Sequence, residues 1–393
     1  MQSDVIKNIN MHAQQHTKLA TRYEALIAKV RKLDGFDSFL KPKKLSALTP
    51  AAANGPVIID IIHIALPNFS SNQAKELHSA LISSLRDNGV QGHNHLKSIL
   101  ARLWSTVVQP ILSEIEDVLH YAAEECLPHI TWCAIGALAF LPLHAAGIYG
   151  SRDPSDNIKL SDFAVSSYTT TLSPMLSSGH SKIQQDPREE PKGLIISQPA
   201  IPDMPPLPGT KEEAGIIQMY TSPEHSCHLT HDEAIVYTVK SAMSKYEIVH
   251  LACHGIQDSK NPLDSAFALY DGRLKLHDLM CLSLENVELA VLSACQTAAG
   301  DENLPEESVH LAAGMLAVGY PSVITTMWSI GDKDAPIVAD KFYASLLGCH
   351  DELVSRNPRQ SAVYALHVAV KHLRKEVGEM EFVKWVPFVH YGV

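Results

Sequence analysis

We predict that this 393-residue chain is an α/β protein with a mostly parallel sheet flanked by helices. In the C-terminal half, short apolar runs alternate with segments of helical periodicity, which is typical of parallel sheets covered by helices on both faces. The apolar content is 46%, which excludes a disordered or collagen-like chain. At about 150 residues per domain, the length predicts two or three domains or one large unit with appendages.

The first 50 residues are predicted to form N-terminal helices and a linker. Apolar residues at helical spacing, among them Ile6, Ile9 and Leu19, indicate one or two amphipathic helices up to residue 33. Residues 40–56 are rich in Pro, Ala and Lys, which favours a linker. No apolar stretch of the signal-peptide kind occurs at the N-terminus.

Residues 51–192 are predicted to form an α/β half of their own. We expect strands at 57–65 and 163–172, short strands within 126–150, and helices at 71–87 and 96–123. Pro110 should break or kink the second helix, because proline removes a helical hydrogen bond. The polar, proline-containing segment 177–192 is expected to be a surface loop.

Residues 193–393 are predicted to form a second α/β half. Apolar runs predict strands at 193–197, 246–252, 287–292 and 322–327, and a hairpin with its turn at Asp271-Gly272. Helices are expected at 212–220, 230–244, 309–318, 333–347 and 361–376. A capping box of Thr230 and Glu233 should open the helix at 230–244.

Charge and cysteine usage limit the function classes. The formal net charge is −11, which argues against a protein that wraps nucleic acid as a whole. Seven cysteines are an odd number and too few for a disulfide scaffold, so we expect a reducing, cytoplasmic setting. The longest apolar stretch, 130–149, contains Thr131, Pro142 and His144. It is predicted to be buried core, and no membrane association is expected.

Two strand ends carry reactive side chains. One apolar run stops at Cys253-His254-Gly255 and another at Ser293-Ala294-Cys295. Ligands and catalytic groups of parallel sheets gather at the carboxyl ends of strands, so adjacent strands would bring His254 and Cys295 together. An imidazole beside a thiol is the pair needed for nucleophilic acyl transfer, and the N–H groups of Gly255 and Cys295 could form an oxyanion hole. A purely structural role for both side chains is the alternative.

Other constellations are weaker. His225, Cys227, His228 and His231 resemble a metal cluster, but no second Cys/His pair follows at a zinc-finger spacing. The chain has no G-x-S-x-G and no Gly-Lys dipeptide, so neither a hydrolase elbow nor a P-loop is present. We therefore expect no metal and no cofactor.

The motifs together resemble a known family. HLACHG at 250–255 and LSACQTA at 292–298 are similar to the motifs of CHAT proteases, members of the caspase-like clan that also holds separase. LPGTKEE at 207–213, DGRL at 271–274, TMWSIGD at 326–332 and the ending WVPF at 385–388 extend the resemblance. The resemblance covers about 57–393, and the motif sequences are similar to those of fungal members. It implies a caspase-like protease half preceded by a degenerate pseudo-protease half.

The resemblance also implies roles for single residues. His254 matches the family's catalytic histidine, Cys295 its nucleophile and Gly255 its oxyanion position. His250 and Cys253 flank the dyad and are interpreted as residues that pack the strand or support the dyad from behind. Ser293, Met327, Trp328, Ser329 and Asp332 are candidate substrate-binding residues, although Trp328 could be core and Asp332 a helix cap. Some relatives that prefer a basic residue carry Asp where this chain has Ser293, so a basic preference is in doubt.

Two functions from different classes follow. The first is a cysteine endopeptidase that cuts a protein substrate through the Cys295–His254 dyad in regulated signalling or cell death, with the acidic loop 298–308 moving on activation. The second is a latent or non-catalytic effector module that responds to a regulatory partner, such as a helical-repeat sensor. Neither requires nucleic acid or a membrane.

Overall fold

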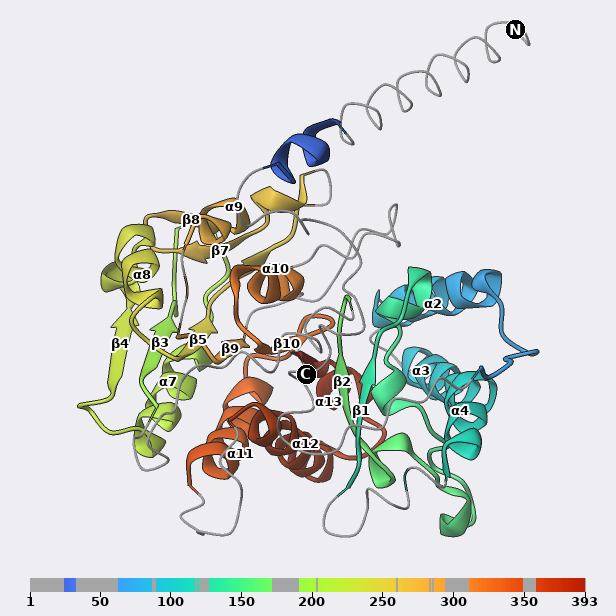
Figure 1. The fold of residues 1–393 in the computed structure, drawn as a ribbon. Coiled ribbons are helices and arrows are strands. Elements are labelled where there is room, and N and C mark those ends of the chain that lie inside the picture. Colours follow the sequence, from blue (N-terminus) through green and yellow to red (C-terminus); the bar gives the residue numbers. More distant parts are fainter. Residues whose placement is uncertain are drawn as a thin grey trace, which may run out of the picture. The chain divides into compact units, whose positions relative to one another are not determined.

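The structure is a computed structural model (Figure 1). It describes residues 25–32, 63–86, 90–116, 119, 127–171, 191–202, 204–258, 261–282, 284, 286–293, 311–348 and 358–392. The chain divides into two compact units, 1–58 and 59–393. In the first unit, residues 25–30 are helical. The remaining N-terminal predictions, and most of the strand expected at 57–65, lie outside the described residues.

The second unit is built on one eight-stranded sheet with the order β1-β2-β11-β10-β9-β5-β3-β4. All neighbours pair in parallel except β10 and β11, which are antiparallel. This confirms the predicted fold class. The strands are β1 (His129–Trp132), β2 (Val165–Tyr168), β3 (Gly193–Ser197), β4 (Ser226–Thr230), β5 (Ile248–Ala252), β9 (Leu289–Leu292), β10 (Ser322–Thr326) and β11 (Phe388–Gly392).

Helices cover both faces of this sheet (Figure 1). The central strands β3, β5, β9 and β10 are buried along their whole length, which explains their nearly continuous apolar sequences. One layer contains α7, α11 and α12, since α11 packs on both of the others. The helices are α7 (Gly209–Tyr220), α8 (Val236–Met243), α9 (Leu276–Met280), α10 (Leu311–Val318), α11 (Asp334–Leu347), α12 (Pro358–Val377) and α13 (Phe382–Trp385).

Strands from both predicted halves share the sheet. Tyr168 of β2 pairs with Tyr391 of β11, so residues before 192 continue the sheet formed by residues after it. A polar chain also crosses this junction. His390 contacts the hydroxyl oxygens of Ser167 at 2.6 Å and Ser322 at 2.8 Å, and Ser167 contacts His129 at 2.6 Å. The division at residue 192 stays a prediction.

The region before β3 holds both a confirmed and a wrong prediction. The helices α2 (Ser71–Arg86), α3 (Val90–Leu103) and α4 (Gln109–Glu114) are present, and the π-helix η2 (Trp104–Val108) joins α3 to α4 just before Pro110. The wider turn accommodates the proline, which has no N–H to donate. Within 127–150 only β1 is a strand. The apolar residues after it form the 3₁₀ helices η3 (Gly136–Phe140) and η4 (Leu143–Ala145).

Further short 3₁₀ helices separate the strands: η5 (Pro154–Asp156), η6 (Leu160–Asp162), η8 (His231–Glu233) and η9 (Pro262–Asp264). Among the described residues, no helix combines the length and apolar character needed to cross a membrane.

The predicted capping box at Thr230 is wrong. Thr230 ends strand β4, and its hydroxyl accepts a hydrogen bond from Ser197 at 3.0 Å. Helix α8 begins six residues later, and the carboxylate of Asp271 accepts the N–H of Val236 at 2.8 Å. Asp271 lies in the hairpin between β7 (Ala266–Leu269) and β8 (Gly272–Lys275), which turns one residue earlier than predicted.

Candidate active site

The candidate site lies at the carboxyl ends of the central strands β5 and β9. The two strands pair in parallel, with Leu251 directly opposite Leu292. The chain leaves β5 at Ala252, two residues before His254, and it leaves β9 one residue before Ser293. This edge of a parallel sheet is where α/β folds bind ligands, because no strand pairing continues beyond it.

His254 is half-buried and held from two sides. Its Nε2 lies 2.7 Å from the carbonyl oxygen of Pro205, in the segment between β3 and α7. A carbonyl only accepts, so Nε2 carries the proton in this contact. Its own carbonyl accepts the N–H of Ala268 of β7 at 2.9 Å. In the neutral ring, Nδ1 is then the nitrogen free to accept a proton.

Gly255 begins the short strand β6 (Gly255–Ile256). It pairs with Phe267 in a three-stranded antiparallel sheet formed by β6, β7 and β8. The strand therefore fixes the backbone immediately after His254. A role for the Gly255 N–H as an oxyanion donor stays a prediction.

Cys295 and the acidic segment 298–308 lie outside the described residues. The nucleophile and oxyanion roles of Cys295 and the movement of the acidic segment therefore stay predictions.

Ser293 joins a buried polar network beneath this edge. Its hydroxyl donates to Oε2 of Glu213 at 2.9 Å, and Glu213 lies on α7 with only 3% of its surface exposed. The other carboxylate oxygen of Glu213 is 3.1 Å from Nε2 of His250, a buried residue of β5. This contact is an ion-pair distance without hydrogen-bond geometry. The network thus links the strands that precede His254 and Cys295.

Tyr343 of α11 completes the network. Its hydroxyl lies 3.0 Å from Nδ1 of His250. Burial raises the pKa of Tyr343 well above its ordinary value, and the Glu213 carboxylate raises it further. The tyrosine is therefore protonated at neutral pH and can donate to Nδ1, so that Nε2–H of His250 faces the carboxylate. A small cavity of about 20 Å³, room for one water molecule, adjoins the network.

The predicted substrate-binding residues after β10 differ in their exposure. Met327 and Trp328 are each 7% exposed, and Trp328 Nε1 donates to the carbonyl of Val383 at 3.0 Å. Trp328 is thus anchored in the core, as its alternative interpretation had it. Ser329 is exposed. Residues 327–330 are not part of a strand.

Asp332 contacts α7. One of its carboxylate oxygens accepts the N–H of Gly209 at 2.8 Å, at the first residue of that helix. A Cβ at position 209 would collide with Asp332, so only glycine permits this approach. Asp332 therefore caps α7 from a distant segment. Its predicted contact with substrate stays untested.

Sequence reasoning missed Glu213, Tyr343 and Pro205. For Glu213 a signal was available. It shares one face of α7 with Ala214 and Ile217, at the spacing that buries side chains. A carboxylate on the apolar stripe of a helix indicates a buried partner. The carbonyl of Pro205 left no such signal, because any residue supplies one.

The cysteine and histidine cluster of the sequence lies on and after β4. His228 Nε2 contacts the hydroxyl of Ser197 at 2.8 Å, and the ring of His231 packs edge-on against Tyr270. Among the described residues, no group of three or more His, Cys, Asp or Glu side chains could hold a metal ion.

Comparison with known proteins assigns the family. The family model described as the CHAT domain matches residues 97–393, well over half of the chain. The chain therefore belongs to the CHAT domain family, as its motifs predicted. A search of curated proteins finds no match.

Three solved structures of other proteins are similar in fold to this chain. The Arg-specific cysteine proteinase gingipain R has 12% identity and a TM-score of 0.49, and the match covers 73% of this chain and 68% of the other. The complex of Porphyromonas gingivalis RgpB pro- and mature domains has 10% identity and a TM-score of 0.48, and the match covers 73% of this chain and 69% of the other. The Saccharomyces cerevisiae separase–securin complex has 13% identity and a TM-score of 0.45, and the match covers 74% of this chain and 17% of the other.

Proposed function

We propose that this chain is a cysteine endopeptidase in which His254 and Cys295 form the catalytic dyad. One observation carries the proposal. Leu251 and Leu292 are directly opposite in register, and the chain reaches His254 three residues after Leu251 and Cys295 three residues after Leu292. Equal offsets from paired positions favour arrival at the same edge of the sheet. Membership of the CHAT family supports the same assignment.

In the proposed reaction, the Cys295 thiolate attacks the carbonyl carbon of the scissile peptide bond. Nδ1 of His254 accepts the thiol proton and returns it to the leaving amine as the C–N bond breaks. Water then hydrolyses the thioester, which releases the carboxyl product and restores the thiol. The N–H groups of Gly255 and Cys295 stabilise the developing oxyanion. The contact between His254 and Pro205 keeps the ring in the tautomer that this sequence of steps requires.

The proposed substrate is an exposed loop of another protein, cut once in a regulated signalling or cell-death event in the cytoplasm. Ser293, Met327, Trp328, Ser329 and Asp332 are the candidate substrate-binding residues. Ser329, exposed after the end of β10, is best placed among them to meet a peptide. A helical-repeat sensor is the proposed regulatory partner.

Thiol labelling tests this proposal. The chain is treated with peptidyl acyloxymethyl ketones that carry Arg, Lys, Asp, Leu or Met next to the warhead, and intact mass reports the adduct. We expect labelling that disappears in Cys295→Ala and slows by about 10²-fold or more in His254→Ala, the usual contribution of a general base. Cys281→Ala is the matched control, because Cys281 is an exposed cysteine outside the site.

The outcomes separate the two functions. Labelling of a folded chain that depends on Cys295 and His254 supports the peptidase, and the preferred probe identifies the first substrate pocket. Labelling that survives in Cys295→Ala contradicts the dyad. A folded chain that no probe labels favours the latent effector module, which requires its partner first.

A further inference from the structure

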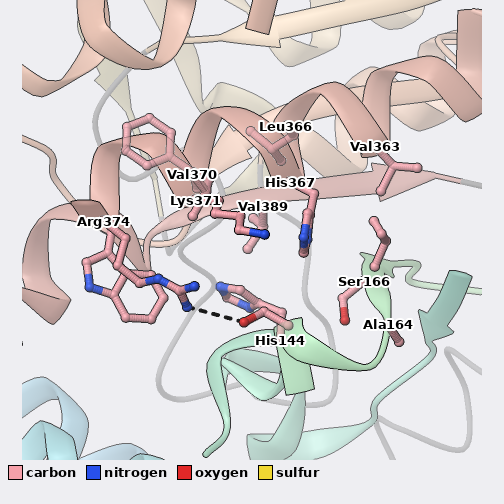
Figure 2. Close-up of a pocket in the computed structure, with 14 residues that line it drawn as sticks. His144, Ala164, Ser166, Val363, Leu366, His367, Val370, Lys371, Arg374 and Val389 are labelled. Atoms are coloured by element: carbon pink, nitrogen blue, oxygen red, sulfur yellow. Dashed lines mark hydrogen bonds between the residues drawn. The ribbon is translucent and has the colours of Figure 1, made fainter. Parts of the chain in front are cut away.

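A second cleft lies away from the candidate active site, between α12 and β2 (Figure 2). One wall is a single face of α12, at positions 363, 366, 367, 370, 371 and 374. The opposite wall contains His144 and Ser161 of the 3₁₀ helices η4 and η6 and residues 164–166 at the start of β2. The volume of its interior that a water molecule can reach is about 60 Å³. The empty volume is about 580 Å³ when the open mouth of the cleft is included.

The cleft follows from how two strands meet. β2 and β11 pair only at Tyr168 and Tyr391, at their carboxyl ends. β2 pairs with β1 and β11 with β10 along their whole lengths, but toward their amino ends β2 and β11 do not pair with each other. The gap between them is therefore not closed by a strand ladder, and side chains of Ser166 and Val389 line the space instead.

Basic side chains of α12 converge on this space. Figure 2 shows His367, Lys371 and Arg374 of α12 directed toward the cleft. Among the described residues, no acidic side chain lines it. Arg374 donates to the hydroxyl of Ser161 at 3.2 Å and stacks over the ring of Trp385 at 5.4 Å. Within the part of the chain that the structure describes, neither Lys371 nor Arg374 forms a salt bridge to an acidic side chain.

The titratable groups around the cleft determine its net charge near pH 7. Burial lowers the pKa of His367, and Lys371 and Arg374 lower it further, so this ring is neutral near pH 7. His144 is also neutral, and both of its ring nitrogens are engaged, by Tyr168 and by the carbonyl of Val386. Lys371 and Arg374 are therefore the two cations among the described lining residues. Asp162 lies near enough to raise the pKa of His367, but its carboxylate is also 4.0 Å from the ammonium group of Lys159, outside the cleft.

We propose that this cleft binds a small amphipathic carboxylate. The planar guanidinium of Arg374, held by Ser161 and Trp385, presents donors in the geometry that a carboxylate matches. Lys371 adds the second donor. The apolar body of the ligand lies along the apolar part of the lining: Ala164, Val165, Val363, Leu366, Val370, Phe388 and Val389. The ligand would bridge segments from both predicted halves. This proposal does not depend on the peptidase function.

Titration of the full chain with sodium octanoate, followed by isothermal calorimetry and ligand-observed NMR, tests the site. Octyl phosphate and 1-octanol are the comparison probes. Lys371→Gln is the test variant, because Lys371 is exposed and a surface substitution should leave the fold intact. Lys375→Gln is the matched control, since Lys375 is an exposed lysine of the same helix outside the cleft.

We expect saturable octanoate binding that weakens about tenfold in Lys371→Gln, the effect of losing one charge-assisted hydrogen bond. Lys375→Gln should bind as the unchanged chain does, and 1-octanol should bind at least about tenfold more weakly for the same reason. The proposal is overturned if the chain does not bind octanoate, if Lys371→Gln binds it equally well, or if octanol equals octanoate. Binding of octyl phosphate without octanoate overturns the carboxylate assignment.

Discussion

Replacement of Glu213 should weaken both the fold and the candidate active site. Glu213 is buried on α7, where it accepts a hydrogen bond from Ser293 and faces His250. His250 belongs to β5, which leads to His254, and Ser293 directly follows β9, which leads to Cys295. A change at Glu213 therefore acts on the site through the strands that carry it, without contact with the proposed reacting atoms.

The contacts indicate the size of the effect. In Glu213→Ala, the hydroxyl of Ser293 and the imidazole of His250 remain buried without their partner, and a buried polar group left unsatisfied costs about 1–3 kcal/mol. Glu213→Gln keeps the shape and an acceptor for Ser293. It loses the charge, and the difference between charged and neutral hydrogen bonds predicts a loss of about 1–2 kcal/mol.

Urea unfolding measures the free energy of unfolding of each variant, and labelling of Cys295 by the best peptidyl probe reports the site. Glu212→Gln is the matched control, because Glu212 is the exposed neighbour on the same helix. A surface change of this kind should stay within about 0.5 kcal/mol. We expect the loss of stability and the slowing of labelling both to increase from Glu212→Gln through Glu213→Gln to Glu213→Ala.

One result would refute this reasoning. If Glu213→Gln and Glu213→Ala unfold within about 0.5 kcal/mol of Glu212→Gln, the carboxylate contributes no more than a surface group does. Unchanged labelling combined with the expected stability loss would show that the network supports the fold alone.

Two further predictions concern stability. Burial, and then His129, lower the pKa of His390 to about 3. The unfolded chain therefore takes up this proton first, at its ordinary pKa near 6.5, and the free energy of unfolding should fall by about 2 kcal/mol between pH 6.5 and 5 from this residue alone. Urea unfolding at several pH values checks this, and a flat profile in that interval would contradict it. Asp332→Ala should cost about 1 kcal/mol, because it removes the hydrogen bond to Gly209 at the start of α7. Ser329→Ala, an exposed change nearby, is its control, and equal unfolding midpoints for the two variants would refute the capping role.

Much of the fold could be predicted from sequence because local patterns of apolar residues determine its strands and helices. Strands β3, β5, β9 and β10 are continuous apolar runs, and these runs are buried on both faces. Helices α11 and α12 showed clear helical periodicity. The positions of His254 and Ser293 at strand ends followed from where those runs stop. The strand register then placed Leu251 opposite Leu292, in agreement with the expected adjacency of the two strands.

Local patterns failed where a distant partner decided the structure. Thr230 and Glu233 have the spacing of a capping box, but pairing with β3 extends β4 through Thr230. The apolar segment after Trp132 has strand-like composition, yet Gly136 adopts φ of +60° and the chain coils into 3₁₀ turns. Strand pairing in the folded state outweighed local preference in the first case, and backbone conformation at one glycine interrupted the strand in the second.

The sequence alone determined the class of this protein: a mostly parallel α/β chain of the CHAT family, with a histidine and a cysteine after two apolar strands. Tertiary structure decided what surrounds those residues. Ser293 meets Glu213 across 80 positions, His254 meets Pro205 across 49, and the cleft beside α12 arises where β2 and β11 separate. Such contacts depend on how packed elements approach one another. No local pattern of residues encodes them, because each partner is chosen by the fold as a whole.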